Sequence, residues 1–335
     1  MPLGLMLMFI ESLIFAVGFA SSLLSMPAVM KFMRSRGIVG VDMHKPDRPS
    51  IPEMGGVAVL IGLTASTLVA AALMPERANI LLAFLSSALI AGIIGAIDDL
   101  KPLSARVKPL LTLLSGVPIL LMGAYNPRGP VFPIIGQTRL SLVYPIVIII
   151  ALAVTSNAVN MLDPFNGTMS GSCTVITISM LISSLILGRW EGLILSLCLL
   201  GPLLVLYLFN KYPAKVFSGD VGSLSIGAAL GALAIIGRLE AAAVIAFAPQ
   251  IMNAFYGLST IGRLYERREV PRPVILRDDG RLEATSDPKA PITLARIILA
   301  YGPLHEREAA RTIIILSIIS GILSIFTAYL MKVTA

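Results

Sequence analysis

Four aspartates stand at the ends of otherwise apolar segments of this chain: Asp98, Asp99, Asp163 and Asp220. A carboxylate can bind a divalent cation or exchange a proton, and placing an ionised one at the centre of a membrane helix costs roughly 2.5 to 3.5 kcal/mol. Such residues are therefore interpreted as functional by default. We expect these four to converge on one site.

Asp98 and Asp99 are adjacent and close an apolar run, where the helix dipole is negative and disfavours anions. Two carboxylates about 4 Å apart repel by roughly 4 kcal/mol at an effective dielectric constant of about 20. A proton, an arginine or a metal ion could compensate, and a solvated acidic helix end is the plain alternative. Lys101, Arg106 and Lys108 follow at once, which fits either ion pairing or a phosphate beside a metal.

Side-chain oxygens recur every three residues in the next polar stretch, at Asn157, Asn160, Asp163 and Asn166. The first three could line one side of a helix end before Pro164 breaks the helix. Polar contacts between helices, followed by a Pro-Phe-Asn-Gly turn, would explain the pattern without chemistry. Four such oxygens in ten residues are more than that explanation requires.

Asp220 begins a later apolar run, where a carboxylate can cap a helix and is favoured by the dipole. Phe217 precedes it as an aromatic residue at the water-facing edge, and Gly219 and Gly222 allow close backbone approach to a ligand. Hard oxygen ligands without a neighbouring histidine or cysteine suit Mg²⁺ or Mn²⁺. His44, in a charged loop, is either solvated or catalytic.

The elements that position these residues are membrane helices. Of the 335 residues, 56% are hydrophobic and 13% are charged, against about 25% charged in soluble domains. Spanning a bilayer takes about 17 to 25 apolar residues. The runs long enough to do so are 4–30, 54–74, 79–97, 109–123, 141–159, 168–187, 192–209, 221–237, 241–262 and 312–331. We therefore predict an all-α polytopic membrane protein with about ten transmembrane helices, the fourth being short and interrupted by glycine and proline.

The distribution of Lys and Arg orients these helices. With ten spans, one face carries the loops 31–53, 98–108, 160–167, 210–220 and 263–311, which hold 20 of the 26 basic residues. The positive-inside rule makes this face cytoplasmic, and leaving out the long last loop still gives ten against six. All four aspartates then lie at the cytoplasmic edge. The net charge of +7 has two interpretations. The basic residues either orient the protein and attract anionic lipid, or some of them bind phosphates.

We expect residues 1–335 to form a single integral membrane domain. Its one sizeable extramembrane piece is 263–311, where two short strands joined around Asp279-Gly280 predict a small β-hairpin. Pro291 occupies a plausible first position of a following helix, which would lie on the membrane surface. The segment 124–140, rich in Pro and Gly, is expected to be a structured loop on the other face, with a hairpin as one option.

Together these stretches resemble the polyprenyl-phosphate N-acetylhexosamine-1-phosphate transferases, ten-helix enzymes that move a sugar 1-phosphate from a UDP-sugar to a lipid phosphate. The similarity runs from about residue 31 to the last span. Each motif alone is weak, and their order is specific. The motifs are Ile-Pro-Glu-Met-Gly-Gly (51–56), Asp-Asp-Leu (98–100), Asn-Ala-Val-Asn-x5-Asn-Gly (157–167), Phe-Ser-Gly-Asp-Val-Gly-Ser (217–223) and Pro-Arg-Pro (271–273).

The resemblance implies a catalytic and a metal-binding set. Asp98 matches the family's candidate base for the lipid phosphate, and Asp99 matches its acidic neighbour near the metal and phosphates. Lys108 matches a lysine that contacts phosphate. Asp220 and Asn160 look like the ligands of Mg²⁺, or of Mn²⁺ in its place.

The resemblance also implies a substrate-binding set. Phe217 matches a residue that stacks on uracil, Asn166 one that hydrogen-bonds it, and Arg272 a pyrophosphate-binding arginine. A fork-shaped guanidinium suits that last role. Asn157 and Asp163 are assigned to the substrate side of the site, Asp163 as a substrate contact or a support for the ligands.

Two departures from the family bear on the substrate. The bacterial muropeptide branch has a run of histidines in the last cytoplasmic loop, which this chain lacks, so a pentapeptide substrate is disfavoured. Eukaryotic GlcNAc-1-phosphate transferases have a second arginine where this chain has Val274, and Arg277 or Arg281 could take its place. The resemblance is closer to the eukaryotic and archaeal branch, and it implies an archaeal enzyme that begins N-glycan assembly.

The resulting expectation is a cell-membrane transferase with a cytoplasmic active site. It would move GlcNAc 1-phosphate, or a related N-acetylhexosamine 1-phosphate, from a UDP-sugar to polyprenyl or dolichyl phosphate and release UMP. A divalent cation with Lys108 and Arg272 would screen the repulsion between the two anionic substrates. Direct attack is favoured, and a covalent phospho-enzyme at Asp98 is the other route. Membrane lipid is a further partner, nucleic acid is not expected, and a homodimer is one option.

Two other classes of protein also contain carboxylates at membrane depth. An ion-coupled secondary transporter would use them to bind Na⁺ or H⁺, but the four acids lie at one face and no symmetric repeat is visible. An intramembrane aspartyl protease would use a Gly-x-Gly-Asp motif, in which Phe217 here takes the place of the first glycine.

Overall fold

The computed structural model describes residues 3–265 and 269–334, so Arg267 and Arg268 of the charge count lie outside the described residues. Within those ranges the chain is helical, with three small antiparallel hairpins. Eight described helices are long and apolar enough to cross a membrane, and a bent helix pair would make a ninth. The predicted all-α polytopic membrane fold is confirmed.

Each of the eight long helices overlaps one predicted apolar run. They are α1 (Leu3–Ser35), α2 (Gly56–Leu73), α3 (Ala78–Leu100), α6 (Tyr144–Met161), α7 (Thr168–Leu187), α8 (Trp190–Asn210), α9 (Gly219–Ile236) and α13 (Glu306–Thr334). A short 3-10 helix, η1 (Pro75–Arg77), links α2 to α3.

The two remaining predicted runs are interrupted. Residues 109–123 correspond to α4 (Val107–Thr112), the 3-10 helix η2 (Leu113–Gly116) and α5 (Val117–Leu121). Residues 241–262 correspond to α10 (Glu240–Ala246) and α11 (Ala248–Ile261), bent by 64°. Proline lies at each break, Pro118 in α5 and Pro249 in α11, where its missing N–H removes a helical hydrogen bond.

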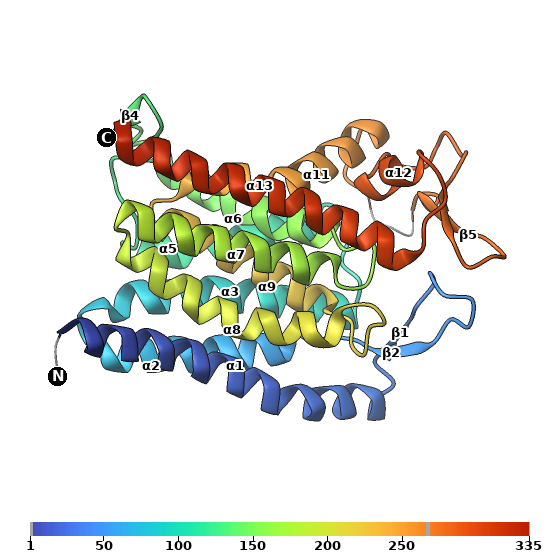
Figure 1. Ribbon diagram of the computed structural model, residues 1–335, viewed down its shortest axis with the longest axis horizontal. Coiled ribbons are helices and arrows are strands. Elements are labelled where there is room, and N and C mark those ends of the chain that lie inside the picture. Colours follow the sequence, from blue (N-terminus) through green and yellow to red (C-terminus); the bar gives the residue numbers. More distant parts are fainter. Residues whose placement is uncertain (1–2, 266–268, 335) are drawn as a thin grey trace.

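The long helices lie side by side along the long axis of the molecule (Figure 1). Helix α9 is central, because 89% of its span is buried against 17% for α1 and 33% for α13. Its start touches α3 through backbone: a Cβ on Gly95 would lie 2.3 Å from the carbonyl oxygen of Asp220. Glycine at this position therefore brings the acidic end of α3 against the acidic start of α9.

The two ends of the helix bundle carry different hairpins (Figure 1). At one end lie β1 (Val39–Val41) paired with β2 (Ser50–Pro52), β5 (Val274–Leu276) paired with β6 (Leu282–Ala284), and the helix α12 (Leu294–Leu299). We call this the α12 end. At the other end lie the start of α1, the end of α13 and the pair β3 (Val131–Phe132) and β4 (Gly136–Gln137). Both hairpins considered from the sequence, in 263–311 and in 124–140, are thus confirmed.

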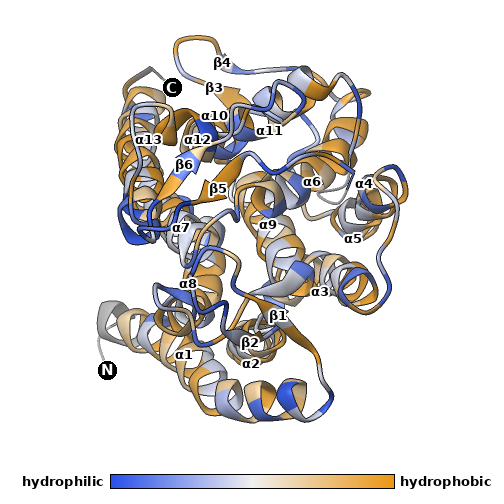
Figure 2. Cartoon of the chain, turned by 90° about the vertical axis from the view of Figure 1, so that its right-hand side faces the viewer, coloured by the Kyte–Doolittle hydropathy of each residue, from blue (hydrophilic) through white to orange (hydrophobic). Residues whose placement is uncertain are grey.

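Figure 2 looks onto the α12 end and shows hydrophilic residues gathered in its loops, with hydrophobic residues along the helices. Helix α12 begins at Leu294, where the Thr293 hydroxyl caps it by accepting from Arg296 N (3.2 Å). The expected helix start at Pro291 is wrong, because the capping threonine follows that proline. Helix α12 packs against β6 and α13, and its contact with a membrane surface stays a prediction.

Candidate active site

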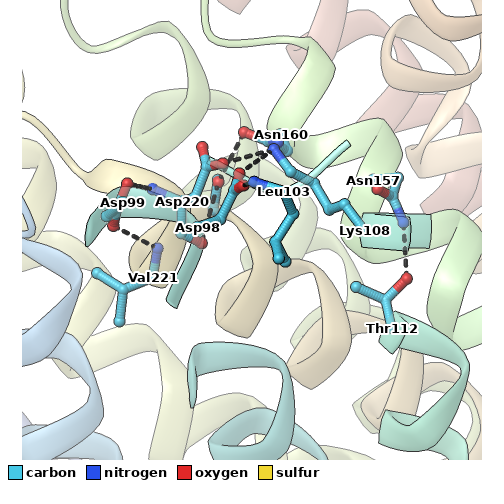
Figure 3. Close-up of polar contacts among 10 residues, drawn as sticks. Asp98, Asp99, Leu103, Lys108, Thr112, Asn157, Asn160, Asp220 and Val221 are labelled. Atoms are coloured by element: carbon cyan, nitrogen blue, oxygen red, sulfur yellow. Dashed lines mark hydrogen bonds and ion pairs between the residues drawn. The ribbon is translucent and has the colours of Figure 1, made fainter. Parts of the chain in front are cut away.

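Three charged side chains from different helices meet at the start of α9. Lys108 Nζ of α4 lies 2.5 Å from Asp98 Oδ2 of α3 and 2.5 Å from Asp220 Oδ2 of α9 (Figure 3). Asp98 Oδ1 also accepts from Leu103 N (2.5 Å). Asp98 and Lys108 are each 8% exposed, so their ion pair is shielded from water, whereas the Asp220 side chain is 26% exposed and stays accessible to a ligand. Of the compensations considered from the sequence, the structure shows an ion pair, and its cation is a lysine.

The two carboxylates stabilise the charged form of Lys108. Burial by itself lowers the pKa of an amine, but the charges of Asp220 and Asp98 outweigh it and raise the pKa of Lys108 above its usual range. Lys108 is therefore an ammonium at neutral pH. It supplies a fixed positive charge among the acids, which is the charge that an incoming phosphate needs.

Asp99 faces the first turn of α9. Its Oδ1 accepts from Asp220 N (2.8 Å) and its Oδ2 from Val221 N (3.0 Å) (Figure 3). The first N–H groups of a helix have no partner within that helix, and the dipole favours an anion there. Asp99 therefore caps α9 from a neighbouring helix. The idea that Asp220 caps α9 is wrong, since the helix has no cap from its own N-cap residue, Ser218, and the Asp220 carboxylate turns to Lys108.

Asn160 of α6 lies beside Asp220 and presents its amide in one of two orientations. In one, its carbonyl oxygen accepts from Ser223 Oγ (3.0 Å) and faces Asp220 Oδ1. Turned by 180°, its nitrogen donates to Asp220 Oδ1 (3.0 Å) and its oxygen accepts from Lys108 Nζ (3.2 Å). In the first orientation two oxygens face each other, a contact that a cation between them stabilises.

In that first orientation, the spacing of the two oxygens is compatible with Mg²⁺. An octahedral Mg²⁺ binds oxygens at about 2.1 Å, so that neighbouring ligands lie about 3 Å apart. The side-chain atom of Asn160 nearest Asp220 Oδ1 is 3.0 Å from it. Carboxylate and amide oxygens are hard ligands, as Mg²⁺ and Mn²⁺ prefer.

Two of the predicted oxygens lie away from the carboxylate cluster. Asn157 Nδ2 donates to Thr112 Oγ1 and to Ala153 O, both at 2.8 Å, and so ties α6 to α4 (Figure 3). Asp163 follows the end of α6 at Met161, so the expectation that it continues the helical face is wrong. Its Oδ2 accepts from Ser218 Oγ (2.9 Å) and fastens the loop before α7 to the start of α9. Substrate roles for Asn157 and Asp163 stay predictions.

The residues expected to hold the nucleotide lie on loops at the α12 end. Phe217 joins β2 and the start of α2 through its backbone, donating to Pro52 O (2.9 Å) and accepting from Gly55 N (2.8 Å). Asn166 is buried, and its Nδ2 donates to Asp42 Oδ2 (2.9 Å). Arg272 is exposed just before β5, and among the described residues no ion pair joins it to a carboxylate. Its role stays a prediction.

Sequence reasoning missed a second buried polar cluster, formed by Asp42, Lys45 and Glu306. Lys45 Nζ pairs with Asp42 and lies 3.6 Å from Glu306 Oε2. Asp42 is 3% exposed and Glu306 4% exposed. The available signal was the concentration of charges around His44, but the partner Glu306 is too distant in the sequence to be inferred from spacing.

Comparison with known proteins agrees with this geometry. The model of glycosyl transferase family 4 matches residues 81–238, a segment that contains the whole carboxylate cluster. The chain is 32% identical over 286 residues to a Methanocaldococcus jannaschii protein provisionally named a glycosyltransferase, covering 85% of this chain and 86% of that protein.

Two further relatives carry more detailed names. Over 316 residues the chain is 26% identical to a Sulfolobus acidocaldarius protein, covering 92% of this chain and 93% of that protein. That protein is provisionally named a UDP-N-acetylglucosamine–dolichyl-phosphate N-acetylglucosaminephosphotransferase. A phospho-N-acetylmuramoyl-pentapeptide-transferase of Moorella thermoacetica is 37% identical over 204 residues, which cover 56% of this chain and 62% of that protein. With a relative above 30% identity aligned along most of its length, this multi-pass membrane protein belongs to glycosyl transferase family 4.

Proposed function

We propose that this protein transfers N-acetylglucosamine 1-phosphate, or a related N-acetylhexosamine 1-phosphate, from a UDP-sugar to a polyprenyl or dolichyl phosphate, and releases UMP. The reaction would be the first step in building a lipid-linked glycan. The names of the archaeal relatives support this substrate pair. No relative named here is a transporter, which leaves the transporter alternative without support.

One observation carries the proposal: a buried ammonium held between two carboxylates at the end of a membrane helix bundle. Lys108 lies between Asp98 and Asp220, with Asn160 beside them. Both substrates are anionic at the atoms that react, so their encounter needs positive charge in a place that excludes water. A membrane-embedded lipid phosphate meets a water-soluble nucleotide at the edge of the bilayer, where these helices begin and end.

The chemistry requires positioning more than covalent help from the protein. An oxygen of the lipid phosphate attacks the phosphorus that bears the sugar, a new P–O bond forms, and the bond from that phosphorus to the oxygen of the UMP phosphate breaks. UMP leaves with both electrons of that bond. The lipid phosphate is already largely ionised near pH 7, so we favour direct attack over a phospho-enzyme at Asp98. Lys108 stabilises the phosphates, while Asp98 holds Lys108 in place.

Asp220 and Asn160 would hold a Mg²⁺ or Mn²⁺ ion. When bound, the cation would neutralise phosphate charge as a Lewis acid. Asp99 fixes the backbone of Asp220, and thereby the place from which the Asp220 carboxylate acts.

We further propose that the site faces the cytoplasm of a cell-membrane enzyme. The bias of basic residues supports this orientation. Both native cysteines are buried, so single cysteines introduced at the exposed Ser286 and Ser141, at opposite ends of the bundle, can be labelled selectively. In intact cells a membrane-impermeant maleimide should label Ser141→Cys and spare Ser286→Cys. The reverse labelling would contradict the orientation.

The function is tested with purified protein in lipid nanodiscs. UMP should appear only when UDP-GlcNAc, polyprenyl phosphate and Mg²⁺ are all present, and EDTA should stop it. A panel of UDP-sugars and lipid lengths then identifies the preferred pair. If no UMP forms with any pair while the protein in sealed vesicles moves a solute across the membrane, the proposal is wrong and the transporter alternative takes its place.

A further inference from the structure

The side-chain amide of Asn166 is held in one orientation by a carboxylate. Its Nδ2 donates to Asp42 Oδ2 (2.9 Å), and the two residues are 7% and 3% exposed. An ionised carboxylate can only accept hydrogen bonds. If the amide turned by 180°, its oxygen would face Asp42 and two buried acceptors would meet, which is unfavourable. The nitrogen therefore stays toward Asp42, and the carbonyl oxygen points away from it.

Asp42 is itself fixed by its neighbours. Its backbone N donates to Pro49 O (3.0 Å), which prolongs the β1–β2 pairing. Lys45 pairs with Asp42 and lies 3.6 Å from Glu306 Oε2, while Glu306 Oε1 accepts from Asn166 N (2.9 Å). The four residues form a closed ring of contacts, so Asn166 cannot turn without breaking it.

A metal is a second way to account for this cluster, because ligand atoms of Asp42, His44 and Glu306 lie within 4.8 Å of one another. The ammonium of Lys45, however, already lies against both carboxylates. Lys45 thus balances one of their two negative charges, and the observation that remains is the fixed amide.

The strand β1 brings this amide close to Phe217. A Cβ on Gly40 would lie 2.3 Å from Glu53 Oε1 and 3.1 Å from Phe217 Cδ2, so the Glu53 carboxylate and the Phe217 ring both lie against the strand at Gly40. Asp42 is two residues further along the same extended backbone, on the same side and about 7 Å away. Asn166 meets the strand there. A pyrimidine stacked on Phe217 would therefore lie within reach of Asn166.

We propose that Asp42 is a positioning residue that makes the nucleotide site select uracil over cytosine through the Asn166 amide. This inference rests on the proposed function, in which Phe217 and Asn166 bind the base of the UDP-sugar. Uracil presents a donor at N3–H beside the acceptor O4, whereas cytosine presents the reverse, an acceptor at N3 beside a donor at N4. With its nitrogen held by Asp42, Asn166 offers its oxygen to N3–H and its second amide hydrogen to O4. Cytosine would set two acceptors against each other at N3.

The test is a comparison of UMP and CMP binding by calorimetry with the full-length protein and Mg²⁺. We expect the wild type to bind UMP more tightly by about 10- to 100-fold, the scale of one well-formed bidentate contact to a base. In Asp42→Asn the new amide can donate or accept, so Asn166 can turn, UMP affinity falls, CMP affinity rises and the ratio approaches one. Asp42→Asn combined with Lys45→Met, which removes both charges together, should give the same loss of selectivity if the single variant does not fold.

Glu306→Gln is the matched control. Glu306 contacts Asn166 through the backbone N–H and not through the amide, so this variant should keep the UMP/CMP ratio even if both affinities change. A wild type that binds neither nucleotide would contradict the proposed function. A selective wild type with an unchanged ratio in Asp42→Asn, or an equal loss of ratio in Glu306→Gln, would overturn the role of Asp42 and leave the proposed function standing.

Discussion

Asp99 Oδ1 accepts a hydrogen bond from the backbone N–H of Asp220 (2.8 Å), joining the last turn of α3 to the first turn of α9. This bond explains how two adjacent carboxylates are tolerated at one helix end. Asp98 is compensated by Lys108, whereas Asp99 is compensated by the N–H groups and the positive dipole of another helix. The two neighbours thus have different partners, Asp98 an ammonium and Asp99 two backbone N–H groups.

Removal of the Asp99 cap of α9 should destabilise the folded protein. We expect Asp99→Ala to lower the free energy of unfolding by about 1 kcal/mol, the usual value of a helix cap, and to lower activity because Asp220 loses its support. Thermal melting in detergent and UMP release measure the two effects. Asp279→Ala, which removes an exposed carboxylate in the β5–β6 turn, is the control and should change neither. Unchanged melting of Asp99→Ala would show that the contact does not hold α9.

Lys108 gives a prediction about pH. Its pKa is raised in the folded protein by Asp220 and Asp98 against the effect of burial, so its stabilising charge is fully present at neutral pH. That charge is lost only as pH rises through the folded-state pKa, above the ordinary lysine value of about 10.4. Activity should therefore show no loss assignable to Lys108 between pH 7 and about 9.

The matching variant is Lys108→Gln, which leaves Asp98 and Asp220 without their cation. We expect kcat/KM to fall by about 100-fold or more, as when a charge-stabilising group is removed from a transition state. Lys101→Gln, an exposed lysine in the same loop, is the control. Near wild-type activity in Lys108→Gln would mean that Lys108 is structural.

The Mg²⁺ dependence of the activity should require the carboxylate of Asp220. Asp220→Asn keeps the shape of the side chain and removes its charge, so the cation loses one of two proposed protein ligands. We expect UMP release to fall by about 100-fold or more, with a melting temperature close to that of the wild type. Titration with Mg²⁺ should show a weaker apparent affinity in any residual activity. Full activity with an unchanged Mg²⁺ requirement would exclude Asp220 as a ligand.

The sequence predicted that the acids share one face, because helix ends and basic residues together define topology. It did not predict which partner each of these acids would have. The partners depend on the packing of α3 on α9 at Gly95, and these two segments lie more than a hundred residues apart in the sequence. The same limit applies to Asp42 and Glu306, which meet through the tertiary fold alone.

Helical periodicity predicts which residues share a helix face, but it does not predict which neighbours each of them contacts. Asn157 and Asn160 are three residues apart and share a broad face of α6, but the 60° between them is enough to give them different neighbours. Asn157 reaches Thr112 and Asn160 reaches Ser223. Asp163 lies past the end of α6, where a spacing of three residues has no helical meaning.

Gly95 can be tested directly. In Gly95→Ala the new Cβ would lie 2.3 Å from Asp220 O, which is backbone and cannot move aside cheaply. We expect the start of α9 to shift, with a loss of stability of about 1 to 3 kcal/mol and a large loss of activity. Gly92→Ala is the matched control one turn earlier, because its Cβ would meet the flexible end of Leu60 (2.6 Å). Equal effects of the two substitutions would contradict the importance of the contact between α3 and α9.

Arg272 tests the proposed pyrophosphate contact. The residue is exposed beside β5, and Arg277 in the same hairpin already pairs with Glu283 (3.1 Å) and Asp279 (3.7 Å). Arg272 is thus better placed to turn toward an anionic ligand. We expect Arg272→Ala to raise KM for the UDP-sugar by about tenfold, the scale of one charge-assisted contact, without a change in melting temperature.

The control for Arg272 is Arg277→Ala, measured with the same UDP-sugar. If Arg272 holds the pyrophosphate, Arg277→Ala should leave KM near the wild-type value and Arg272→Lys should recover only part of the affinity, because an ammonium cannot form the bidentate contact of a guanidinium. If Arg277→Ala raises KM while Arg272→Ala does not, the arginine that binds pyrophosphate lies on β5–β6 itself. The assignment by motif position would then be wrong for this chain.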